Sequence, residues 1–135
     1  MLIYKIVYAD DWLNAFRDGP YEGTAKDKED GFIHFSTGEQ LIETLKLHYP
    51  DDEYRRMLAI SSVDTDMIGE NLKWEQSRNG DLFPHLYGQL TPDAVRKTIV
   101  ASYLSLAERD FSGIREFVDR TGMVAEDDGG HKPNP

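Results

Sequence analysis

The sequence predicts a single α+β domain built around a strongly bent, largely antiparallel sheet with flanking helices. The chain has 135 residues, of which 39% are hydrophobic, so it is long enough for one domain with a substantial core. Segments typical of strands outnumber those typical of helices. Several strand segments follow one another with no helix between them, which favours an antiparallel sheet over the alternating pattern of a parallel one.

The chain is strongly acidic and contains no cysteine. Its 25 Asp and Glu residues against 15 Lys and Arg residues give a formal net charge of −10, and the basic residues form dipeptides, not stripes. Such a surface repels a phosphodiester backbone, so non-specific nucleic-acid binding is not expected. The lack of cysteine excludes a disulfide scaffold, a thiolate metal site and a cysteine nucleophile, and it favours the cytoplasm. No apolar run reaches the ~18 residues of a membrane span, and no targeting segment is expected.

The first thirty residues predict a strand, a helix and a loop. Residues 2–8 are rich in β-branched and aromatic side chains, which is typical of a strand. A helix is expected over residues 11–17, because aromatic and small residues recur there at helical spacing before a Gly-Pro stop signal. Residues 21–30 are expected to form a short strand followed by a solvated, mobile loop, because five consecutive charged residues run from Lys26 to Asp30.

The next segment predicts a strand that leads into a helix. Residues 31–36 alternate between two faces, and His34 shares its face with Phe32 and Ser36. The run from Thr37 to Gln40 has the form of a capping box, which predicts a helix from there to residue 49. The start of this helix would lie three residues after His34, and its dipole favours a phosphate or carboxylate there.

The second half predicts strands over residues 54–63, 71–76, 82–90 and 93–103, although helical spacing competes with strand character in the last of these. An Asn-Gly turn at residues 79–80 joins two of the strands. Trp74 is expected to be a core anchor. A last helix is expected over residues 112–120, closed by Gly122. The single domain would then span residues 1–122, followed by a disordered acidic tail over 123–135.

Two segments have the composition of a functional site. They are Asp-Gly-Phe-Ile-His-Phe-Ser-Thr at residues 30–37 and Phe-Pro-His-Leu-Tyr-Gly at residues 83–88, with the Trp-Glu pair of residues 74–75 between them. A lone histidine on a strand is more often a satisfied core residue, but these two lie among glycines and aromatic residues that suit close ligand contact. We predict that His34, His85 and Tyr87 converge on one concave site, with Glu75 nearby and the helix after Thr37 at its edge.

These segments, in this order, resemble the bacterial domain-of-unknown-function 952 family over residues 2–104. The resemblance implies the ADP-ribosylation architecture, which is the split, bent sheet shared by ADP-ribosyltransferases and RNA 2′-phosphotransferases. In that superfamily a strand histidine followed by a hydroxyl residue holds the nicotinamide ribose, a role that His34 matches with Ser36 or Thr37. Tyr87 matches the tyrosine that stacks on the nicotinamide.

The resemblance also implies a catalytic group and a substrate class. Glu75 is the best candidate for the catalytic glutamate of the transferases, although Trp-Glu is not their catalytic pattern. His85 is the alternative, which would suit a phosphate-handling variant better. The expected function is therefore a transferase that handles NAD, ADP-ribose or a phosphorylated nucleotide, with His34, His85 and Glu75 as catalytic residues and with Ser36, Thr37 and Tyr87 as ligand-binding residues. NAD is the expected cofactor, and a small-molecule nucleotide is the expected partner.

Two other functions are compatible with the same residues. The first is a non-catalytic module that binds a nucleotide or another small ligand and would not release nicotinamide from NAD. The second is a metal site, because His34, His85 and Glu75 have the composition of a two-histidine, one-carboxylate centre. These three residues lack the local spacing typical of metal ligands, so no metal is expected.

Overall fold

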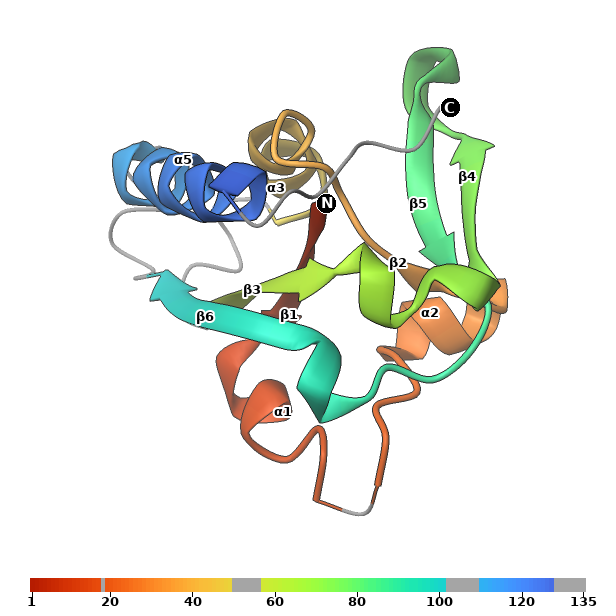
Figure 1. The fold of residues 1–135 in the computed structure, drawn as a ribbon. Coiled ribbons are helices and arrows are strands. Elements are labelled where there is room, and N and C mark those ends of the chain that lie inside the picture. Colours follow the sequence, from red (N-terminus) through yellow and green to blue (C-terminus); the bar gives the residue numbers. More distant parts are fainter. Residues whose placement is uncertain (18, 50–56, 102–109, 128–135) are drawn as a thin grey trace.

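The computed structural model describes residues 1–17, 19–49, 57–101 and 110–127 and shows a mixed α+β protein with two antiparallel sheets (Figure 1). The first sheet has the order β1-β3-β6 and the second has the order β2-β5-β4. The strands of the first sheet are β1 (Leu2–Tyr8), β3 (Leu58–Asp64) and β6 (Val95–Ala101). The strands of the second sheet are β2 (Ile33–His34), β5 (Leu82–Leu86) and β4 (Leu72–Gln76).

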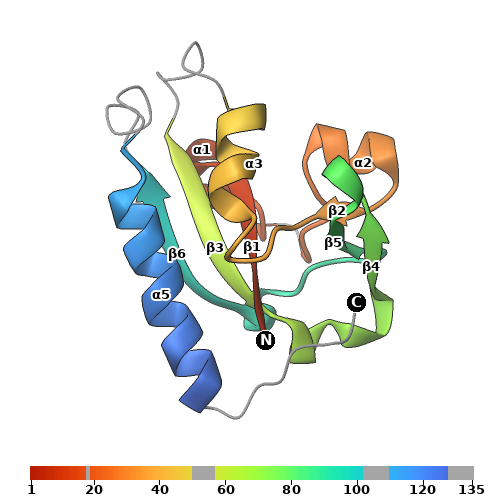
Figure 2. The same ribbon diagram turned by 90° about the horizontal axis from the view of Figure 1, so that it is seen from above.

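Helices cover the first sheet and one end of the second. They are α1 (Ala9–Leu13), α2 (Ala25–Asp30), α3 (Leu41–His48) and α5 (Ser112–Asp127). In Figures 1 and 2, α3 and α5 lie against the first sheet, whereas α2 lies beside the second. Short 3-10 turns occur at Thr65–Met67, Gly69–Asn71, Arg78–Gly80 and Pro92–Ala94. No helix in the described ranges is both long enough and apolar enough to cross a membrane.

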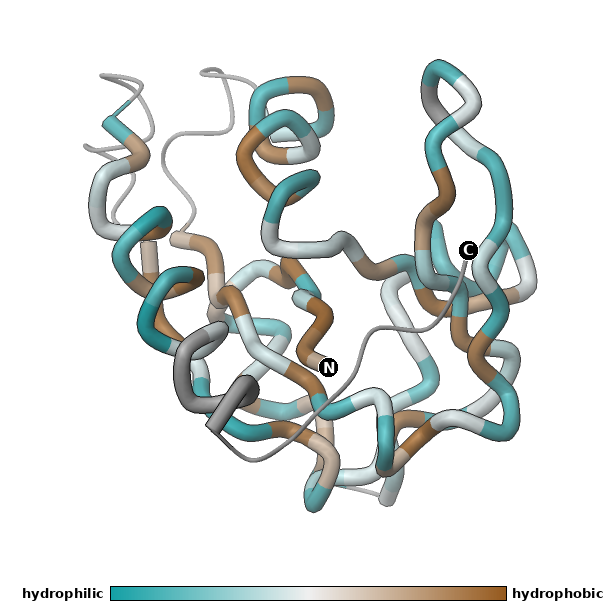
Figure 3. Tube along the Cα trace, turned by 45° about the horizontal axis from the view of Figure 1, so that its top comes forward, coloured by the Kyte–Doolittle hydropathy of each residue, from teal (hydrophilic) through white to brown (hydrophobic). Residues whose placement is uncertain are grey.

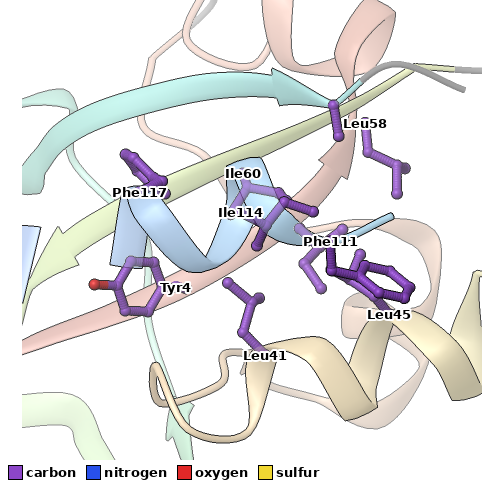
Figure 4. Close-up of a cluster of buried hydrophobic side chains, with 10 residues drawn as sticks. Tyr4, Leu41, Leu45, Leu58, Ile60, Phe111, Ile114 and Phe117 are labelled. Carbon is purple, nitrogen blue, oxygen red and sulfur yellow. The ribbon is translucent and has the colours of Figure 1, made fainter. Parts of the chain in front are cut away.

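One core cluster fills the space between the first sheet and helices α3 and α5 (Figure 4). Tyr4 and Ile6 point toward these helices from alternate positions of β1, as the period of a strand requires. The other buried members of the cluster are Leu41, Leu45, Leu58, Ile60, Ala101, Phe111, Ile114 and Phe117. Helix α5 is further fixed by a buried hydrogen bond of 2.6 Å between the hydroxyl groups of Tyr4 and Thr121.

A second core cluster joins the two sheets. Ile3 and Val7, on the opposite face of β1, belong to the same cluster as Ile33 of β2 and Leu86 of β5. The remaining buried members are Tyr21, Phe35, Val63, Ile68, Leu90 and Ala94. Figure 3 shows hydrophobic stretches along the central strands of both sheets. The two sheets therefore share apolar contacts, and β1 contributes to both cores.

Several predicted elements are confirmed, with changes at their ends. Strand β1 has the predicted bounds, and the competing patterns near residue 95 resolve as strand β6. The reciprocal hydrogen bonds of the predicted capping box join Thr37 and Gln40, at 3.0 and 3.2 Å, one turn before α3. Trp74 is only half-buried, at the border of the second core, so it is a weaker core anchor than expected. The predicted strand positions 54–56 and 102–103 lie outside the described residues.

The expected end of the last helix is wrong. Helix α5 continues through Gly122 to Asp127, so five residues assigned to the tail are helical. Glycine lowers helix propensity by only about 1 kcal/mol, which the packing of the preceding turns against the core can offset. The rest of the predicted tail, residues 128–135, lies outside the described residues.

The largest correction concerns the charged run at residues 26–30. This segment is helix α2 and not a mobile loop, and Asp27 within it is only 2% exposed. Thr24 and Asp27 form a capping box, in which the Asp27 backbone N–H donates to the Thr24 hydroxyl at 3.1 Å and the Thr24 N–H donates to the Asp27 carboxylate at 2.9 Å. Gly31 ends the helix in the left-handed conformation, with φ of 87°. Local capping therefore outweighs the charge density of the run.

Candidate functional site

The candidate site lies on one face of the second sheet, where β2 pairs with β5. His34 and His85 are directly opposite each other in this register, and their ring centroids lie 5.6 Å apart. Glu75 on β4 and Tyr87 just after β5 complete a polar group on the same face, since Glu75 is hydrogen-bonded to His85 and Tyr87 donates to Glu75. The structure therefore brings together four of the six predicted site residues, which are His34, Glu75, His85 and Tyr87.

Carboxylates lie against both ring nitrogens of His34. Its Nδ1 is 2.6 Å from Oδ1 of Asp27, and its Nε2 is 2.9 Å from Oδ2 of Asp30. The backbone N–H of His34 donates to the same Oδ1 of Asp27 at 3.1 Å. Because an ionised carboxylate only accepts hydrogen bonds, this arrangement orients the ring and satisfies both nitrogens best when both carry protons.

Asp27 forms a buried ion pair with Lys5, a residue of β1. The Lys5 ammonium is 2.7 Å from Oδ2 of Asp27, and the two side chains are 5% and 2% exposed. Burial alone would raise the pKa of Asp27, but the hydrogen bond with His34 and the charge of Lys5 together hold this pKa well below its usual range. Asp27 is therefore a carboxylate at neutral pH, held from one side by Lys5 and from the other by His34.

His85 is oriented by a second carboxylate. Its Nδ1 lies 2.9 Å from Oε1 of Glu75, and the Tyr87 hydroxyl donates to the same oxygen at 2.6 Å. The pKa of Glu75 is lowered mainly by the hydrogen bond from Tyr87 and next by the hydrogen bond with His85. Glu75 in turn raises the pKa of the Tyr87 hydroxyl. Glu75 therefore carries a negative charge next to the ring of His85.

The Nε2 atom of His85 receives no hydrogen bond from another described residue. His85 is buried, with 6% of its surface exposed. An imidazole whose Nδ1 is held by a carboxylate and whose Nε2 has no other partner has the form of a general acid or base.

Aromatic rings surround the two histidines. Phe32 stacks on His85, with centroids 4.1 Å apart and ring planes 22° apart, and it contacts His34 at 4.6 Å and Tyr87 at 5.2 Å. The Lys73 ammonium lies 4.9 Å from the centroid of the Tyr87 ring. The site thus combines acid–base groups with aromatic surface, a combination that suits a planar ligand ring.

Ser36 and Thr37 lie apart from this group in their side-chain contacts. The Ser36 residue is buried, and its hydroxyl lies 3.1 Å from the hydroxyl of Thr44 on α3. The Thr37 hydroxyl accepts the backbone N–H of Gln40. The turn formed by residues 37–40 separates His34 from α3, which begins at Leu41. The ligand-binding roles of Ser36 and Thr37 stay predictions.

Sequence reasoning gave no role to Lys5, Asp27 or Phe32. Two signals were present in the chain. The spacing Thr24-x-x-Asp27 is that of a capping box, and it pointed to a helix within the charged run. A lysine in the middle of an apolar strand, as at position 5, predicts a buried charge that needs an acidic partner. Neither signal could identify the partner, because the residues lie far apart in the sequence.

No group of three or more His, Cys, Asp or Glu side chains among the described residues is arranged to hold a metal ion. His34 and His85 instead each pair with their own carboxylates, as described above.

Comparison with known proteins identifies relatives without a described activity. A family model described as "Protein of unknown function (DUF952)" matches residues 6–98. The crystal structure of protein CC0527 from Caulobacter crescentus is 40% identical, with a TM-score of 0.67, and the match covers 74% of this chain and 85% of that one. The solution structure of CC0527 is 41% identical with a TM-score of 0.61, covering 73% and 82% of the two chains. No curated protein matches.

Proposed function

The chain belongs to the DUF952 family, and we propose that it is a transferase that acts on NAD or on another nucleotide carrying ADP-ribose or phosphate. The observation that carries this proposal is the pair of histidines on adjacent strands, each held by its own carboxylate, with ring centroids 5.6 Å apart. Two such groups within reach of one ligand allow one to bind and the other to move a proton.

His85 is assigned the proton transfer. Its Nε2 atom has no hydrogen-bond partner among the described residues, while Glu75 at Nδ1 stabilises the positive charge that the ring gains with a proton. An imidazole in this setting contributes roughly 10²–10⁴-fold to a rate. Oε1 of Glu75 contacts both Nδ1 of His85 and the hydroxyl of Tyr87, so these two residues orient the ring for the same step.

His34 is assigned to ligand binding. Its side chain is 36% exposed, so a ligand can approach the ring from solvent. A ribose hydroxyl or a phosphate oxygen could replace the partly exposed carboxylate of Asp30 at Nε2, whereas the buried carboxylate of Asp27 stays at Nδ1. His34 would then hold the ligand, while His85 lies next to the bond that is formed or broken in the reaction.

Aromatic and acidic groups favour NAD as the donor. The nicotinamide ring of NAD carries a positive charge, which is attracted by the ring of Phe32 and by the carboxylate of Glu75. In the proposed step the bond between nicotinamide and ribose breaks, a bond from the ribose to an acceptor oxygen forms, and the acceptor proton passes to His85 Nε2. The proton then returns to solvent, so neither an oxidant nor a metal is required.

We also propose that the fold is related to that of the ADP-ribosylation superfamily. The division of six strands into two three-stranded antiparallel sheets, β1-β3-β6 and β2-β5-β4, supports an ADP-ribosylation-like architecture, because that superfamily is built on a split sheet. Fold analogy alone carries no activity, so the functional argument depends on the histidine pair and not on the sheets.

The test combines turnover with binding. The protein is incubated with NAD, and released nicotinamide is measured by chromatography, while calorimetry measures binding of NAD, ADP-ribose and a nucleoside monophosphate. We expect release by the wild-type protein, loss of release with retained binding in His85→Gln, and no change in His48→Gln, which alters an exposed histidine of α3.

Two other results would change the conclusion. Binding of NAD or ADP-ribose with no release of nicotinamide in the wild-type protein would favour the non-catalytic binding module. The absence of binding to all three ligands would overturn the nucleotide proposal.

A further inference from the structure

We propose that Lys5 is a positioning residue for the site: through Asp27 it fixes the His34 ring with a proton on Nδ1 and presents Nε2 to the ligand. This inference rests on the proposed role of His34 in ligand binding. Lys5 belongs to the first sheet, whereas His34 belongs to the second, so a residue of one sheet would control a functional group of the other.

Lys5 contacts residue 34 by two routes. Its ammonium donates directly to the backbone carbonyl of His34 at 2.9 Å. It also holds Oδ2 of Asp27 at 2.7 Å, and the other oxygen of that carboxylate faces both the backbone N–H and the ring Nδ1 of His34. The carbonyl, the amide and the ring of one residue are therefore all tied to the Lys5–Asp27 pair.

Backbone pairing fixes the chain around His34 but not its ring. Strand β2 pairs with β5, and the two residues that follow it are held by hydrogen bonds of Phe35 to Pro84 and of Ser36 to Tyr4. These backbone hydrogen bonds do not restrain rotation of the His34 ring about its side-chain bonds. The contact from Asp27, which is itself held by Lys5, supplies that constraint.

Stability by itself does not account for this ion pair. Removing two charges from water costs several kcal/mol for each ion, and well-packed apolar residues often replace such a pair with no loss of stability. Lys5 lies on the face of β1 that also carries Ile3 and Val7, where an apolar side chain would pack against the second sheet. A charged residue here is better explained by its effect on Asp27 and His34.

The chemistry of the carboxylate selects the tautomer. The hydrogen bond from Lys5 keeps Asp27 ionised, so Oδ1 can accept a proton but has none to give. Nδ1 of His34 must then be the donor in this contact at 2.6 Å. Changes in protonation are thereby restricted to Nε2, which faces the partly exposed Asp30.

The first measurement needs no variant and no substrate. Long-range ¹H–¹⁵N NMR spectra of the full chain distinguish protonated from unprotonated imidazole nitrogens. We expect the His34 Nδ1 signal to be that of a protonated nitrogen throughout neutral and mildly alkaline pH. An unprotonated Nδ1, or a mixture of both neutral tautomers, would overturn the proposal whether or not the protein acts on NAD.

The second measurement removes both charges together. In the double variant Lys5→Met/Asp27→Asn we expect a mixture of His34 tautomers and a roughly 10²-fold slower release of nicotinamide, because small misplacements of a bound reactant have effects of that size. Lys28→Met, which alters an exposed lysine of α2, is the matched control. It should change neither the His34 tautomer nor the rate of nicotinamide release.

The outcomes separate positioning from a purely structural role. A folded double variant whose His34 tautomer and release rate equal those of the wild type would show that the pair only stabilises the fold. If the wild type releases no nicotinamide, the proposed function fails, while the tautomer spectra still decide the role of Lys5.

Discussion

The imidazole rings of His34 and His85 lie side by side on the paired strands β2 and β5, with centroids 5.6 Å apart. Two unrelated core histidines would have no reason to be within reach of one ligand. Here His34 contacts the carboxylates of Asp27 and Asp30, whereas His85 contacts that of Glu75.

Replacing His34 should weaken ligand binding more than it affects folding. In His34→Gln the exposed edge of the site loses a hydrogen-bond partner for the ligand, worth about 0.5–1.5 kcal/mol, or up to roughly tenfold in affinity. Calorimetry with NAD and ADP-ribose measures the change, and the melting temperature serves as the control for folding. Unchanged affinity would remove His34 from the binding role.

Stability should fall in acid because of Asp27. The pKa of this carboxyl is lower in the folded protein than its ordinary value of 3.8, so its stabilising effect is complete above that pH and is lost as the pH falls below it. Urea unfolding between pH 6 and pH 2 should show a steeper loss of stability in the wild type than in Asp27→Asn. Parallel curves for the two proteins would contradict this expectation.

Removing only one member of the buried ion pair should be severe. Lys5→Met leaves the Asp27 charge buried without its partner, which typically costs about 3–5 kcal/mol. The double variant Lys5→Met/Asp27→Asn should recover a large part of this loss, because no charge then remains in the interior. Denaturant titrations of the two variants and the wild type give the comparison. A single variant as stable as the wild type would mean that water reaches Asp27.

Glu75 should control the ionisation of Tyr87. The hydrogen bond to Glu75 raises the pKa of the Tyr87 hydroxyl, so Glu75→Gln should lower that pKa toward the ordinary value of 10.0. The ¹³Cζ chemical shift of Tyr87 followed through alkaline pH reports this value directly. An equal titration midpoint in both proteins would show that the Tyr87–Glu75 contact is not maintained in solution.

Helix α5 should be sensitive to the size of residue 38. A Cβ at Gly38 would lie 2.6 Å from Cγ1 of Val118, closer than real contacts allow, so Gly38→Ala should destabilise the protein by about 1–3 kcal/mol. The double variant Gly38→Ala/Val118→Ala makes room for the new methyl group and should be more stable than Gly38→Ala alone. If the two variants melt at the same temperature, the close approach of α5 to this turn is not under strain.

The strands could be predicted from the sequence because their pattern is local. The alternation of apolar and polar residues around His34 and His85 is enough to assign faces, and the structure places both rings on one side of the second sheet. Periodicity predicted one strongly bent sheet, whereas the described strands form two sheets. Which strands pair depends on contacts between residues far apart in the sequence, and no local pattern contains them.

The supporting residues could not be predicted in the same way. The charges around Asp27 made residues 26–30 resemble a solvated loop, and only the Thr24 cap distinguishes them from one. The partner of Asp27 is Lys5, which is 22 positions away, and the charge pattern cannot tell that lysine from the others in the chain. Long-range pairing of charges is set by the packing of the two sheets, so it becomes visible only in three dimensions.

Asp27 also has a consequence for how relatives of this protein can diverge. One carboxylate caps α2 through Thr24, neutralises Lys5 and holds His34, so a single mutation at position 27 removes all three contacts together. A mutation that removes the charge at position 5 alone leaves the Asp27 carboxylate buried without its ion-pair partner. Each single substitution on the way from this pair to an apolar one therefore passes through a destabilised protein. Positions 5 and 27 should covary, and lineages that have lost the pair should also have lost the histidine at position 34.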